Sequence, residues 1–218
     1  MIEPLPFMSI RPVMAFLMRS VRQLFLPAAA LAAGLFTQPA FAWKAAEQVK
    51  TYPVTGQSGA ELYQSIGANG PVISGERRTI AHTTFKLTWR RDYRERADGG
   101  CVIAVNVPKL IITYTLPKPR GGLPSGVASS WKRFYDGLAA HERVHGQHII
   151  EMVKAIEDVS VGLSAPNDPG CHKVRAELQT HLKRLSDEQR ARGREFDRIE
   201  MGDGGAVQQL VLGLVNGR

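Results

Sequence analysis

The stretch His141-Glu142-Arg143-Val144-His145-Gly146-Gln147-His148 lies within a long run of helical periodicity. Steps of three, four and seven residues place apolar and histidine side chains on one face, the face expected to point to the core. Imidazoles on such a face need polar partners, because burying an unpartnered polar group costs free energy. The pattern therefore predicts a helix over about residues 130–163 with a buried histidine cluster. The side chains of this stripe are Phe134, Leu138, His141, His145, His148, Met152 and Val159.

The first five residues of the quoted stretch form an H-E-x-x-H motif. Helix positions i and i+4 lie on the same face, so His141 and His145 can bind a single Zn²⁺. Glu142 can then act as the general base on a zinc-bound water and pass the proton to a leaving amine. The motif predicts hydrolysis of peptide or amide bonds. The alternative is a metal-free histidine cluster satisfied by hydrogen bonds, with Glu142 as an ordinary surface carboxylate.

A catalytic zinc site of this kind needs a third protein ligand. His148 shares the face but lies about 10.5 Å along the axis from His141, so it can bind only if the helix breaks at Gly146. A second long helix is expected over about residues 171–197, and an antiparallel return would bring Asp197 to the height of the motif. The predicted metal ligands are His141, His145 and Asp197, with His148 as the alternative. Other side chains that the same return could supply are Glu177, His181, Glu195, Glu200 and Asp203.

Three stretches of alternating apolar and polar residues precede the motif helix. They cover residues 85–89, 101–107 and 110–116, and the last two end at Pro108 and Pro117. Their close spacing predicts an antiparallel meander. The expected fold is therefore α+β, with a small antiparallel sheet followed by two long antiparallel helices, the first of which carries the motif.

Shorter elements are expected at both ends of this core. Residues 48–54 are typical of a short strand, and the capping box that begins at Ser58 opens a helix through Ile66. A glycine-rich turn over residues 202–205 leads to an apolar segment at 206–215, which we expect to pack against the body.

The first 42 residues are typical of a signal peptide. Arg19 and Arg22 precede an apolar, alanine-rich run over residues 24–36, and Ala40-Phe41-Ala42 matches a cleavage site after Ala42. Residues 1–17 are surplus to such a leader, so the true start of translation is expected to lie after them. The apolar run is too short and interrupted for a stable membrane span. An uncleaved anchor is the alternative.

Residues 43–218 are enough for a single metallopeptidase-like domain. Cys101 and Cys171 are the only cysteines, and an even count in an exported chain favours one disulfide. Neither has a partner at C-x-x-C spacing, so cysteine ligation of zinc is not indicated. The expected location is the periplasm or the extracellular medium.

The chain has a formal net charge of +8, which favours anionic partners such as components of the cell envelope. It does not indicate nucleic-acid binding, because the basic residues over 183–198 alternate with acidic ones and form a solvated helix face. The expected partner is a protein or peptide substrate, and the residues do not indicate an oligomeric state.

Several of these residues carry a resemblance to a known family. They are Tyr52, Gly56, the Thr84–Trp89 strand, Cys101, Leu116-Pro117, Trp131 and the H-E-x-x-H motif. On them the chain resembles the DUF922 family of bacterial exported proteins, described as predicted secreted zinc-dependent proteases. The resemblance implies an exported α+β domain with a metallopeptidase-like helix. The Tyr-Asp-x-x-Thr-x-His-Gly tail of that family is matched at Asp197, whereas its threonine and histidine are not matched in Phe196–Gly204.

Three functions are compatible with the sequence. The first is an exported zinc metallopeptidase, a hydrolase that acts on proteins or cell-envelope peptides. The second is a non-catalytic periplasmic module, stabilised by a structural zinc or only by the disulfide. The third is a zinc amidase that acts on cell-wall peptides. Metal content separates the first from a metal-free module, and the effect of replacing Glu142 separates an enzyme from a structural site.

Overall fold

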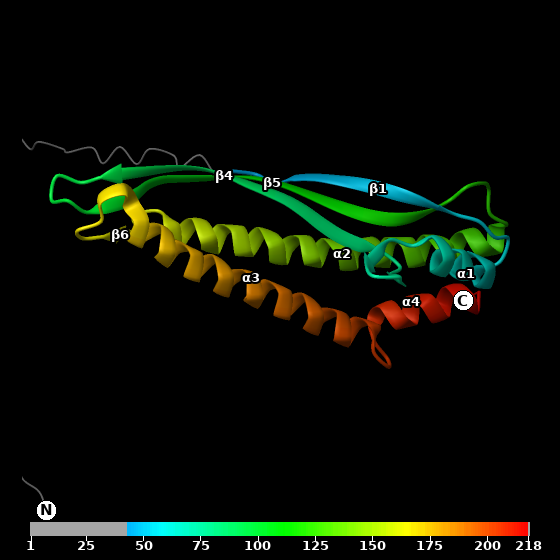
Figure 1. The fold of residues 1–218 in the computed structure, drawn as a ribbon. Coiled ribbons are helices and arrows are strands. Elements are labelled where there is room, and N and C mark those ends of the chain that lie inside the picture. Colours follow the sequence, from blue (N-terminus) through cyan, green and yellow to red (C-terminus); the bar gives the residue numbers. More distant parts are fainter. Residues whose placement is uncertain (1–42, 218) are drawn as a thin grey trace, which may run out of the picture. The chain divides into compact units, whose positions relative to one another are not determined.

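A computed structural model describes residues 43–217 of the chain, so the predicted signal peptide lies outside the described residues. The fold is mixed α+β, as predicted. The helix α2 lies along one face of the main sheet, and α3 runs antiparallel beside it (Figure 1). The elements are β1 (Ala46–Val54), α1 (Gly59–Asn69), β2 (Val72–Ser74), β3 (Arg77–Arg78), β4 (His82–Glu95), β5 (Cys101–Pro119), α2 (Ser125–Ser160), β6 (Ser164–Ala165), the 3₁₀ turn η1 (Pro169–Cys171), α3 (His172–Met201) and α4 (Ala206–Val215).

The main sheet has the order β1-β5-β4 and is mixed, so the prediction of a purely antiparallel sheet is wrong. β4 and β5 pair antiparallel over almost their whole length, but β1 pairs parallel with β5, from Ala46 beside Ile111 to Val54 beside Pro119. Alternating polarity reports which face of a strand is buried. It carries no information on the direction of the neighbouring strand, which is why the sequence did not reveal this pairing.

Two of the three predicted strands are one continuous strand, β5, which does not end at Pro108. Pro108 lies opposite Trp89 of β4, and β1 pairs with β5 only from Ile111 onward. On the side away from β4, Pro108 therefore has no neighbouring strand among the described residues. Proline, which lacks an N–H donor, is found within sheets mainly at edge positions of this kind.

The helix α2 is continuous from Ser125 to Ser160, so it begins five residues earlier than predicted and does not break at Gly146. Gly146 instead permits close packing on the sheet. A Cβ atom at this position would lie 2.1 Å from the hydroxyl oxygen of Tyr114 on β5. That hydroxyl donates a hydrogen bond of 2.9 Å to Glu47 at the start of β1. The glycine in the motif stretch therefore sets the distance between α2 and β5.

The predicted disulfide between Cys101 and Cys171 is present, with a Cα–Cα distance of 5.3 Å. It links the start of β5 to the start of α3, and both cysteines are buried beside Ile103 and Val174. Asp168 caps the same helix end, because its carboxylate accepts hydrogen bonds from the backbone N–H groups of Lys173 and Val174. The origin of α3 is thus fixed by one covalent bond and one cap.

The shorter predicted elements are present. Ser58 accepts a hydrogen bond from the N–H of Glu61 and caps α1, which continues beyond Ile66 to Asn69. α4 packs against α2 near Gly137, where a Cβ atom would meet Leu210. None of the helices within residues 43–217 combines the length and apolarity needed to cross a bilayer.

Candidate metal centre

The facing sides of α2 and α3 bring His141, His145 and Asp197 together. One carboxylate oxygen of Asp197, Oδ1, lies 2.8 Å from Nε2 of His145 and 3.2 Å from Nε2 of His141. The two Nε2 atoms lie 3.2 Å apart. The structure therefore gathers the three predicted ligands at one point, although 52 residues separate Asp197 from the nearer histidine.

The spacing of these three atoms suits a zinc ion. Zinc bonds of 2.0–2.1 Å in a tetrahedral site place neighbouring ligand atoms about 3.3 Å apart. The three separations here, between 2.8 and 3.2 Å, are close to that edge length. Two imidazoles and one carboxylate are also ligand types that Zn²⁺ accepts. The residues present thus fit a zinc ion in both geometry and chemistry.

The cluster is buried on the α2 side and open on the α3 side. The side chain of His141 is 2% exposed and that of His145 is 15% exposed, whereas that of Asp197 is 44% exposed. A metal bound here would be shielded by the two imidazoles and would keep access to solvent beside Asp197.

The phenyl ring of Phe196 orients both imidazoles. It stacks on His141 with ring centroids 4.7 Å apart, and it meets His145 edge-on at 5.4 Å. These contacts restrict rotation of the two rings, and such restriction keeps metal-binding atoms preorganised. No sequence pattern indicated this role, because an aromatic residue in an amphipathic helix is ordinarily part of a core.

Asp197 and His145 shift each other's pKa. Burial alone would raise the pKa of Asp197, but hydrogen bonds from His141 and His145 outweigh it and hold that pKa well below its ordinary range. Burial would lower the pKa of His145, yet the hydrogen bond and charge of Asp197 raise it overall. Asp197 is therefore ionised at neutral pH, which is the form that binds a metal.

Glu142 is buried between α2 and the start of β4, and only 3% of the residue is exposed. Its Oε2 atom accepts a short hydrogen bond from the hydroxyl of Thr83. Burial raises the pKa of Glu142, although Thr83, His145 and His141 act in the opposite direction. Thr83 lies 59 residues from Glu142 in sequence, so no local pattern could have identified it.

His148 lies outside the three-residue group. Its ring centroid is 6.3 Å from that of His145, and the helix break that it would need at Gly146 does not occur. Burial and the nearby charge of Arg192 lower the pKa of His148. This histidine is therefore placed as a neighbour of the cluster, with its ring edge-on to Phe196.

The other side chains considered from the sequence are dispersed along α3 and the turn that follows. Glu200 is the nearest, with Oε2 3.8 Å from Nδ1 of His141. Glu177 and His181 lie near each other at 4.0 Å, Glu195 binds Arg198, and Asp203 accepts a hydrogen bond from Gln208. None of these five belongs to the group that could hold a metal among residues 43–217. The identity of the ligands stays a prediction, now with Asp197 placed against both histidines.

Comparison with known proteins identifies a family that this chain matches. The family model described as a bacterial protein of unknown function, DUF922, matches residues 49–205. The matched range contains the whole of α2, with the H-E-x-x-H motif, and extends through Asp197 to the end of α3. No curated protein and no solved structure matches the chain.

Proposed function

The chain belongs to the DUF922 family, and we propose that it is an exported zinc-dependent metallopeptidase that hydrolyses peptide or amide bonds. One observation carries this proposal: His141 and His145 of α2 converge with Asp197 of α3, and Glu142 follows the first of them. The substrate class is protein or peptide, including peptides of the cell envelope.

The number of donors supports a catalytic zinc over a structural one. Structural zinc sites are generally closed by four protein ligands, whereas catalytic sites use three and keep one position open. The described residues supply three, and the half-exposed Asp197 leaves the cluster accessible to solvent. Zinc bound there would supply a Lewis acid that polarises a carbonyl and lowers the pKa of a water molecule to about 7.

The side chains of this protein would position and move the proton. The hydroxyl of Thr83 donates a hydrogen bond to Oε2 of Glu142 and so fixes the orientation of the carboxylate. The other oxygen, Oε1, is then the atom that takes a proton from the attacking water and returns it to the leaving amine. Phe196 and the packing of α2 against β5 keep the imidazoles in place.

Two features support an exported location. The disulfide between Cys101 and Cys171 is of a kind that persists in oxidising compartments. The first 42 residues have the composition of a signal peptide with a cleavage site after Ala42. Together they favour the periplasm or the extracellular medium.

The decisive experiment combines metal analysis with hydrolysis of fluorescently labelled casein by residues 43–218. We expect about one zinc per chain and measurable hydrolysis. Glu142→Gln should keep the zinc and lose at least about 100-fold in rate, because only the proton acceptor is removed. The matched control is Glu177→Gln on the exposed side of α3, which should leave both unchanged. Full hydrolysis by Glu142→Gln would contradict the proposal, and zinc without hydrolysis would favour a structural site.

A further inference from the structure

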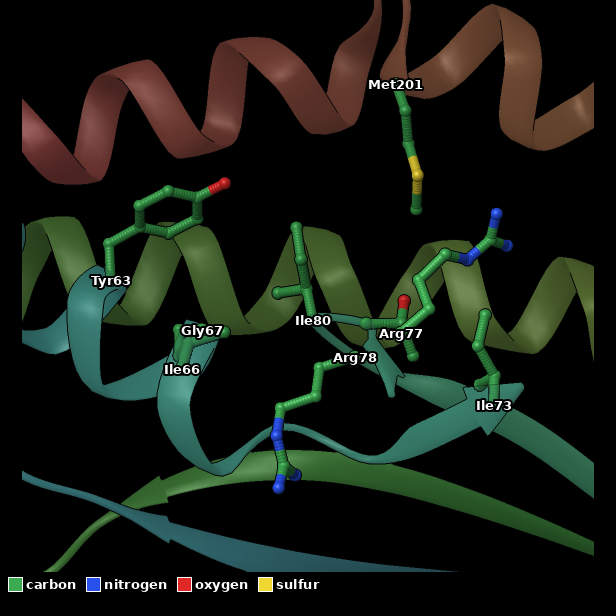
Figure 2. Close-up of a pocket in the computed structure, with 9 residues that line it drawn as sticks. Tyr63, Ile66, Gly67, Ile73, Arg77, Arg78, Ile80 and Met201 are labelled. Carbon is green, nitrogen blue, oxygen red and sulfur yellow. The ribbon is translucent and has the colours of Figure 1, made fainter. Parts of the chain in front are cut away.

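A pocket of about 460 Å³ lies between α1, the β2–β3 hairpin and the end of α3 (Figure 2). Its walls are mainly apolar, formed by Ile66, Ile73, Ile80 and Met201. Tyr63 extends from α1, the helix that also carries Ile66 (Figure 2). A concave site of this size and lining is typical of a place where a protein receives a small apolar group.

Part of the apolar lining is left in contact with solvent. Tyr63 is 37% exposed and Met201 is 41% exposed, although both side chains border the pocket. Large apolar side chains that gather at a hollow, and are not scattered singly over the surface, mark a binding site. The lining therefore indicates that part of the ligand is apolar.

The charge at the pocket is positive. Arg77 and Arg78 both line it, and within residues 43–217 no aspartate or glutamate does. Arg78 is held by a hydrogen bond of 2.6 Å from Nη1 to the carbonyl oxygen of Gly70. Arg77 is exposed, and its guanidinium points away from that of Arg78 (Figure 2). A guanidinium so placed suits a carboxylate, which it binds through two parallel hydrogen bonds.

Two separate segments of the chain connect the pocket lining to the candidate metal centre. Met201 lies one helical turn beyond Asp197 on α3, about 6 Å along the axis. Ile80 lies three residues before Thr83, whose hydroxyl donates a hydrogen bond to Glu142. A peptide whose scissile bond lay at the metal centre could therefore place a nearby residue in this pocket.

We propose that this pocket is a substrate subsite that binds a bulky apolar side chain together with a neighbouring carboxylate of the peptide. The assignment rests on the proposed peptide hydrolysis at His141, His145 and Asp197, which it deepens by naming the substrate class. The aliphatic walls would receive the side chain, and Arg77 would bind the carboxylate. The preferred substrates are thus peptides with an apolar residue beside an acidic residue or at the C-terminus.

Binding can be tested with a small probe that contains no peptide bond between two amino acids. N-acetyl-leucine carries both groups, and N-acetyl-leucinamide lacks the carboxylate. Ligand-detected NMR on residues 43–218 should show saturable, millimolar binding of the acid and binding of the amide weaker by about tenfold. Arg77→Gln should lower the affinity for the acid to the affinity that the wild type has for the amide. Arg90→Gln, an exposed arginine of β4 outside the pocket, is the control.

Gly67 offers a second test, independent of charge. It lines the pocket, and a Cβ atom built on it meets nothing within 4 Å. Gly67→Leu should therefore occlude the pocket without a clash and lower the affinity for N-acetyl-leucine by at least about tenfold. Gly126→Leu is the matched control, because this helical glycine of α2 also faces open space but is not part of the pocket lining. Circular dichroism establishes that both variants are folded.

A variant at the metal centre distinguishes binding in the pocket from binding at the metal. His145→Ala disables the metal centre but leaves the pocket intact, so N-acetyl-leucine should still bind with the same affinity. Loss of binding in His145→Ala would mean that the carboxylate binds the metal, and it would overturn the subsite. Equal affinities for N-acetyl-leucine and its amide would also overturn the subsite. So would an unchanged affinity of N-acetyl-leucine for both Arg77→Gln and Gly67→Leu. Failure to find zinc or hydrolysis would overturn the proposed function and leave these binding results standing.

Discussion

Glu200 places its Oε2 atom 3.8 Å from Nδ1 of His141, on the side of the imidazole ring opposite Asp197. That nitrogen is buried and has no hydrogen-bond partner among the described residues. Histidines that bind zinc through one ring nitrogen usually donate from the other to a carboxylate, which fixes the ring and strengthens the ligand. The distance is too long for a hydrogen bond, and a small change of side-chain torsion would close it.

We therefore predict that Glu200→Ala weakens zinc binding by about 10–100-fold. Glu200→Gln should retain most of the affinity, because the amide oxygen still accepts a hydrogen bond. Competition with a chromogenic chelator measures the change. Glu195→Ala is the control, since Glu195 is exposed and, within residues 43–217, pairs only with Arg198. Equal affinities for Glu200→Ala and the wild type would remove Glu200 from the site.

Asp197→Ala should abolish stoichiometric zinc binding, because two imidazoles alone rarely hold the ion in competition with buffer. The matched control is Asp187→Ala, an aspartate of α3 that pairs with Lys183 and Arg190 on the solvent side. Metal content after gel filtration distinguishes the two variants. Retention of a full equivalent of zinc by Asp197→Ala would show that another side chain completes the site.

Removing the disulfide should destabilise the fold without moving the three residues of the candidate metal centre. Cys101 and Cys171 are 70 residues apart, and closing such a loop contributes on the order of 4 kcal/mol in the chain-entropy model. The double variant to alanine should have a clearly lower midpoint in urea, and mass spectrometry of the unreduced wild type should show one intramolecular bridge. Two alkylatable thiols in protein prepared from the periplasm would contradict the bond.

Gly146→Ala should destabilise the protein by about 1–3 kcal/mol, because its methyl group would overlap the hydroxyl of Tyr114. Tyr114→Phe in the same chain should recover part of the loss, since it removes the nearest atom. Gly126→Ala provides the contrast: its methyl group meets open space and should stabilise α2 by about 0.5–1 kcal/mol. Urea unfolding of the three variants gives these differences. An equal effect at both glycines would argue against close packing at Gly146.

Asp168 should contribute to the acid sensitivity of the fold. Burial alone would raise its pKa, but the N–H groups of Lys173, Val174 and His172 outweigh it and lower the pKa below its ordinary value. A depressed pKa in the folded state stabilises the protein above the pKa of the unfolded chain, and this stability is lost as the pH falls through the folded-state pKa. Asp168→Asn keeps a capping oxygen but does not ionise. Its melting temperature should therefore decline less than that of the wild type between pH 6 and about pH 3. Parallel declines would exclude this contribution.

Much of this architecture could be predicted from local patterns. The stripe from Phe134 to Val159 indicated the motif helix, and the pair of cysteines indicated the disulfide. The capping box at Ser58 marked the start of α1. These predictions succeeded because helix periodicity, capping and loop chemistry depend on residues a few positions apart.

The direction of β1, the continuity of β5 through Pro108 and the bond from Thr83 to Glu142 were not accessible in this way. Each of them depends on partners that are distant in sequence, and alternating polarity reports burial but not pairing. Because the two predicted helices have similar lengths, several carboxylates of the second helix were compatible with a position beside the motif.

By itself, the sequence determined which chemistry this protein can carry: two imidazoles one helical turn apart, with a carboxylate between them, on the buried face of a long helix. Only the tertiary structure decided which distant side chain lies beside them. The packing of α3 against α2 places Asp197 against both histidines and leaves His148 outside the group. Helical spacing fixes distances along one helix, whereas the distance between two helices is set by the side chains packed between them.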